Sequence, residues 1–81
     1  RVKEILCELE KTLSLLHEQQ VNKARAMARR IRPDLTPEDL LNPDNFPDVI
    51  ADPDFMYEDG LAAGILSAKM AVRARLLELD A

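Results

Sequence analysis

The sequence predicts an all-α fold on three observations. Apolar residues recur at helical spacing from residue 2 to residue 31, all five prolines fall between residues 33 and 53, and residues 53–79 contain no helix breaker except two glycines. Eighty-one residues suit one domain with a small core, so we assign residues 1–81 to a single helical domain. We expect two long antiparallel helices, 2–32 and 53–79, joined by a connector, 33–52, that contains one short helix.

The first helix is predicted by an apolar stripe with spacings of three and four residues. Pro33 ends it, because proline cannot continue the backbone hydrogen bonding of a helix. Gln20 lies in the middle of the stripe, where a lone polar residue either fixes the register of a bundle or marks a ligand pocket. The stripe consists of Val2, Leu6, Leu9, Leu13, Leu16, Gln20, Ala24, Met27 and Ile31.

The connector contains two signals for the start of a helix. Thr36, followed by Pro37 and by Asp39 in the position of a capping box, predicts a short helix at about residues 37–42. Asp52, followed by Pro53, predicts the start of the second long helix. The connector is therefore expected to be folded and not a solvated linker.

The second long helix is apolar on more sides than one neighbour can cover. Leucine, isoleucine and valine occupy two sides, and small residues that include Gly60 and Gly64 occupy a third. Two glycines cost about 1 kcal/mol each in a helix interior, so we expect close contact with a neighbouring helix there. A hairpin with a spare apolar side most simply dimerises, so the sequence predicts an antiparallel homodimer in the form of a four-helix bundle. The predicted packing and dimer residues are Leu9, Leu13, Leu16, Gln20, Gly60, Gly64, Ile65, Ala68, Val72 and Leu76.

Charge is distributed unevenly along the chain, although the net charge is only −4. Residues 1–32 contain eight bases and four acids, whereas residues 33–68 contain nine acids and no base. Residues 23–32, which we call the basic segment, hold Lys23, Arg25, Arg29, Arg30 and Arg32. These bases either bind nucleic acid or, as we expect, pair with the acids of the connector or with the acidic half of a partner helix.

The acidic stretch 44–59 does not fit a calcium loop. Counted from Asp44, the place that requires glycine is Val49 and the place that requires glutamate is Phe55. The apolar residues of the connector instead predict a structural cap folded over one end of the bundle, unless the aromatic rings stay exposed as anchors for a partner. The candidate partner surface consists of Phe46, Phe55, Tyr57, Arg25, Arg29 and Arg30.

No arrangement of residues predicts catalysis. The chain has one histidine, His17, and one cysteine, Cys7, which lies among glutamates that would disfavour a thiolate. We therefore expect a non-enzymatic protein-interaction module, a dimeric adaptor or regulatory subunit, without cofactor, metal or membrane span. A lone thiol and the absence of a long apolar run suggest the cytoplasm. The alternative is a nucleic-acid-binding regulator that uses the basic segment.

Overall fold

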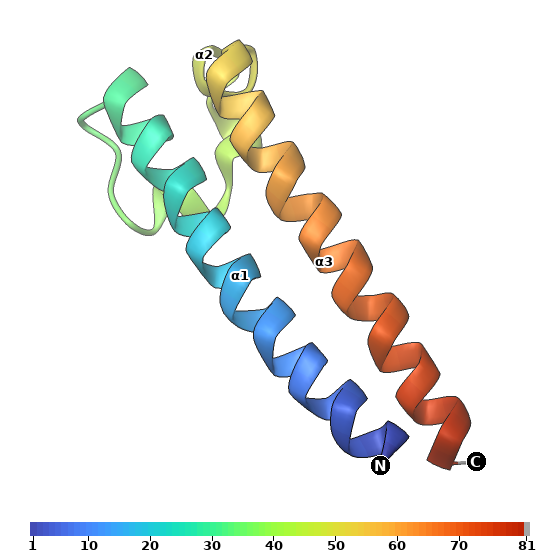
Figure 1. Cartoon of the computed structure of the whole chain (residues 1–81). Coiled ribbons are helices and arrows are strands. Elements are labelled where there is room, and N and C mark those ends of the chain that lie inside the picture. The colour runs from blue at the N-terminus through green and yellow to red at the C-terminus, as the bar shows by residue number, and fades with distance from the viewer. Residues whose placement is uncertain (81) are drawn as a thin grey trace.

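The computed structural model describes residues 1–80, and it contains two long helices joined by a folded connector (Figure 1). Helix α1 spans Val2–Ile31 and helix α3 spans Pro53–Asp80. The two run antiparallel side by side, so that the first and last described residues lie at one end of the hairpin and the connector lies at the other. The described part of the chain is all-helical apart from its turns, as the sequence predicts, and it measures 47 × 20 × 16 Å.

The connector contains three short helices where the sequence predicted one. Two are single 3₁₀ turns, η1 at Asp39–Leu41 and η2 at Pro43–Asn45, and the third is α2 at Pro47–Ile50. Prolines begin η2 and α2, since a proline at the first helical position loses no hydrogen bond. The predicted helix at 37–42 is shorter than expected, because Asn42 leaves the helical conformation one residue before Pro43.

Both predicted caps are present. In the capping box, the Thr36 backbone N–H donates to Asp39 Oδ2 at 2.9 Å, and the Asp39 backbone N–H donates to Thr36 Oγ1 at 3.1 Å. At the start of α3, Asp52 Oδ1 accepts from the backbone N–H groups of Asp54 at 2.9 Å and Phe55 at 3.0 Å. These carboxylates therefore serve the local backbone.

The core lies at the connector end of the hairpin. Leu35, Leu40 and Val49 of the connector pack with Phe55 of α3 against small residues of α1, and Val49 has no exposed surface. Ala24 and Ala28 are both buried, and their short side chains let the connector approach the helix closely. The connector is thus a structural cap on this end, in agreement with its apolar composition.

Gln20 is satisfied within the chain. Its amide nitrogen donates to the backbone carbonyl of Glu58 at 3.0 Å and to the Glu58 carboxylate at 3.3 Å. Since Gln20 is buried, this bond removes the penalty of an unpaired amide and fixes the register between α1 and α3. A second copy is not required to satisfy it.

Arg32 ties the end of α1 to the connector. Its Nε and Nη2 donate to the two oxygens of Asp34 at 2.9 and 2.8 Å, and its Nη1 donates to Asp48 Oδ2 at 3.2 Å. The guanidinium also lies 5.6 Å from the centre of the Phe46 ring, within cation–π range. The hydrogen bond from Arg32 lowers the pKa of Asp34 to about 2.

We predict that Val49→Ala destabilises the fold by about 1–3 kcal/mol, because it leaves a cavity at a fully buried position of the core. The measurement is urea unfolding followed by circular dichroism. Ile50→Ala is the matched control: Ile50 is the next residue along and is 37% exposed, so its truncation should cost clearly less stability than that of Val49. Equal losses at the two positions would contradict the packing described here.

We also predict that the stabilising effect of Asp34 disappears in acid. A carboxyl whose pKa falls on folding contributes stability above its unfolded pKa, here 3.8, and loses it as the pH falls to about 2. The difference in melting temperature between wild type and Asp34→Asn should be small, because the pair is exposed, and should vanish across this window. Asp44→Asn, a nearby carboxyl without an ion pair in residues 1–80, should show no such pH-dependent difference.

Candidate interaction surfaces

A single hairpin leaves most of its large apolar side chains in contact with water. Fourteen large hydrophobic residues of the described chain are exposed, whereas the buried apolar set has eight members, three of them alanine. Away from the connector, the apolar residues buried in the seam between α1 and α3 of the described chain are Ala62 and Leu76, beside the polar Gln20. A large exposed apolar surface of this kind is a candidate interaction surface.

Exposed residues of both long helices form one continuous side of the hairpin, which we call the apolar face. On α1, residues four and seven apart share a side, and on α3, residues seven and eleven apart do so. The apolar face consists of six exposed residues: Ile5, Leu9, Leu16, Leu61, Ala68 and Leu79.

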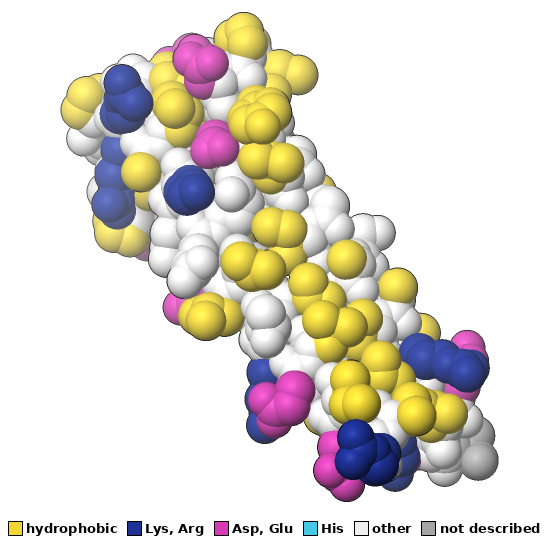
Figure 2. All heavy atoms as spheres, in the orientation of Figure 1, with side chains coloured by type: hydrophobic (Ala, Val, Ile, Leu, Met, Phe, Trp, Pro, Cys, Tyr) yellow, Lys and Arg dark blue, Asp and Glu magenta, His cyan; other side chains and the backbone are white. Residues whose placement is uncertain are grey.

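The two helices contribute to the same side of the seam. A shallow hollow lined by Cys7 and Leu77, spanned by the ion pair between Arg73 and Glu10, marks the opposite side. Leu9 is two residues from Cys7, and Leu79 is two residues from Leu77, so each is turned by about 200° away from that hollow. In Figure 2, hydrophobic side chains follow the length of the hairpin over both helices.

The ten predicted packing and dimer residues separate into three groups. Leu9, Leu16, Ala68, Gly60 and Gly64 are exposed in the single chain. Three are half-buried along the seam, namely Leu13, Ile65 and Val72. Gln20 and Leu76 are buried by the chain's own helices and present almost no surface to a second molecule.

The close helix contact expected at the two glycines is not made within the single chain. A Cβ built on Gly60 or on Gly64 would meet no atom within 4 Å. The reason is orientation: α3 meets α1 through the side that holds Ala62, and each glycine is two residues from Ala62, on the far side of the helix. Helical periodicity groups these small residues but does not say which side faces α1.

The aromatic residues of the candidate partner surface differ in their exposure to solvent. Phe55 is 5% exposed and belongs to the core, so it offers no ring to a partner. Phe46 is half-buried beneath Arg32, and Tyr57 is 66% exposed. Only Tyr57 remains available as an exposed aromatic anchor.

The basic segment pairs with the acidic connector through one residue. Arg32 binds Asp34 and Asp48, whereas Lys23, Arg25, Arg29 and Arg30 form no ion pair with any residue from 1 to 80. The expectation that the connector neutralises the segment therefore holds for Arg32 alone. We call the other four the unpaired bases. Arg25 is half-buried, and Arg29 and Arg30 are exposed.

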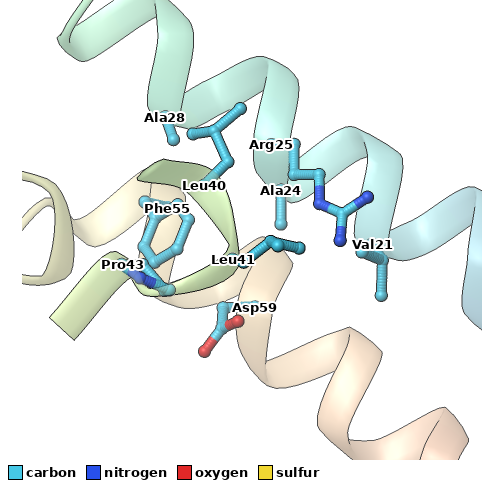
Figure 3. Close-up of a pocket in the computed structure, with 9 residues that line it drawn as sticks. All are labelled: Val21, Ala24, Arg25, Ala28, Leu40, Leu41, Pro43, Phe55 and Asp59. Carbon is cyan, nitrogen blue, oxygen red and sulfur yellow. The ribbon is translucent and has the colours of Figure 1, made fainter. Parts of the chain in front are cut away.

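Two hollows adjoin one another between α1 and the connector, and both are lined by Arg25 and Leu40. The first, of about 220 Å³, is mainly apolar, with Leu41 and Phe55 in its lining and Asp59 at its edge (Figure 3). The second, of about 270 Å³, is more polar and is lined also by Asn22, Arg29 and Pro37. Neither was predicted from the sequence, because both arise where the connector folds back on α1.

Other chemistry has no visible site in residues 1–80. No three histidine, cysteine, aspartate or glutamate side chains there are grouped as metal ligands, and Cys7 is exposed. Neither long helix includes a stretch apolar enough to cross a membrane. Comparison with protein-family models, with curated proteins and with solved structures gave no match.

We predict that Gly60→Ala stabilises the isolated hairpin by about 0.5–1 kcal/mol, because alanine favours the helix and the new methyl group meets open space. Urea unfolding at low protein concentration measures the change. A loss of stability would indicate that another molecule packs closely against α3 at this position.

Proposed function

We propose that this protein is a non-enzymatic interaction module that dimerises through the apolar face and presents its connector end to another protein. The supporting observation is the apolar face itself. In it, leucine and isoleucine side chains line both long helices on the side away from the Arg73–Glu10 ion pair. Two such faces in contact form a four-helix bundle, which covers the surface that a single hairpin leaves in water.

The dimensions of the hairpin are compatible with a stable dimer. Specific interfaces bury about 800 Å² on each partner. The broad side of the hairpin extends 47 by 20 Å, which is of that order. A two-fold dimer would use the same residues on both copies, so one substitution disrupts the contact twice.

A matched pair of adjacent leucines tests the dimer. Leu16, on the apolar face, is 43% exposed, and Leu15, turned away from it, is 56% exposed. We predict that Leu16→Glu converts the dimer to monomer in light scattering at micromolar concentration, because it buries a carboxylate twice at the interface. Leu15→Glu should remain dimeric. A wild-type protein that is monomeric under these conditions, or equal behaviour of the two variants, would refute the proposal.

A second candidate function, nucleic-acid binding, is favoured by one observation: the four unpaired bases lie within a single stretch of α1. The net charge of −4 and the acidic connector beside them oppose it. Phosphate contacts release counterions, so this function requires binding to duplex DNA or RNA that weakens steeply as salt rises. A gel-shift assay at low salt decides the matter, and no shift would exclude it.

If the interaction module works inside the cell, the exposed thiol of Cys7 is compatible with the reducing conditions of the cytoplasm, which we retain as its proposed compartment.

A further inference from the structure

The two adjoining hollows between α1 and the connector form a continuous groove, because Arg25 and Leu40 line both of them. We call it the docking groove. One part offers apolar surface from Leu41, Pro43 and Phe55, and the other offers hydrogen-bond donors from Arg29 and Asn22. The groove therefore combines an apolar pocket with two basic side chains, Arg25 and Arg29, which we call the cationic shelf.

Neither Arg25 nor Arg29, the two bases of the cationic shelf, forms an ion pair with a residue from 1 to 80, although Asp59 lines the first hollow together with Arg25. Arg25 and Arg29 are one helical turn apart on the same side of α1, where like charges repel each other. Three acids of the connector make other contacts: Asp39 is held in the capping box, and Asp34 and Asp48 bind Arg32. Two guanidinium groups and an amide around one hollow match a carboxylate from another molecule.

We propose that the docking groove binds a short acidic segment of a partner protein. An apolar side chain of the segment enters the first hollow, and a neighbouring carboxylate is bound by Arg25 and Arg29. This assignment rests on the proposed function, because it specifies the kind of partner that the interaction module would bind. Asp59 at the edge of the first hollow repels carboxylates and so directs the acidic part of the segment toward Arg29.

The groove remains open in the proposed dimer. Arg25 is nine residues from Leu16, about two and a half helical turns, so the two side chains leave α1 in opposite directions. The apolar face and the docking groove therefore do not compete. Loss of peptide binding can thus be separated from loss of the dimer.

The probe is a fluorescein-labelled peptide in which one leucine is flanked by glutamates, and the readout is fluorescence anisotropy with the full chain. Wild type should bind it, and Arg25→Gln should bind about tenfold or more weakly, because a charge-assisted hydrogen bond is lost. Arg73→Gln is the matched control: it removes the same charge from an exposed arginine at the other end of the hairpin, on the side away from the apolar face, and should bind as wild type does. Leu41→Ser should weaken binding without changing the charge.

Two variants of the peptide test which of its side chains the groove recognises. Replacing the glutamates of the peptide by glutamine should abolish binding, and replacing its leucine by serine should weaken it severalfold. The proposal is overturned if wild type does not bind the acidic peptide, if the glutamine peptide binds equally, or if Arg25→Gln and Arg73→Gln behave alike. It is also overturned if duplex DNA or RNA displaces the peptide and binds more tightly. Light scattering on Arg25→Gln should still show a dimer. Failure of the peptide-binding test would therefore not bear on the proposed dimer, which has its own test.

Discussion

The packing of the connector against two alanines of α1 determines how the rest of the hairpin is arranged. Ala28 is 1% exposed and Ala24 is 5% exposed, and their small side chains make room for Leu40 and Val49. Larger residues at these positions would push the connector outward and open the core, because a packed interior does not absorb extra volume without strain. The start of α3, the position of Arg32 and the docking groove all follow from this contact.

Much of the fold follows from local rules that act within a few residues. Periodic apolar residues, Pro33 and Pro53 indicate where the long helices end and begin, and Thr36 and Asp52 make the predicted caps. The features that could not be predicted depend on how the helices are oriented against one another in the folded chain. Helical spacing groups Gly60 with Gly64 but does not say that α1 lies on the other side, and nothing near Gln20 in sequence identifies Glu58 as its partner.

The candidate site shows the same limit. The sequence identifies a basic segment and an acidic connector, and their proximity along the chain favours mutual neutralisation. Only Arg32, which follows the last turn of α1, forms ion pairs with these acids, whereas Arg25 and Arg29 lie beside the connector without forming one within residues 1–80. Phe55 and Tyr57 are two residues apart in α3, yet one is core and the other is surface.

The antiparallel course of α1 and α3 gives the molecule a mechanical property. The ends of the two long helices lie together, with Lys3 and Asp80 joined by an ion pair, and the connector lies at the far end of a body 47 Å long. Anything attached before α1 or after α3 is therefore held at the end of the hairpin opposite the connector, away from the groove. In the proposed function, the hairpin would act as a spacer that separates a tethered group from the bound partner by the length of a helix.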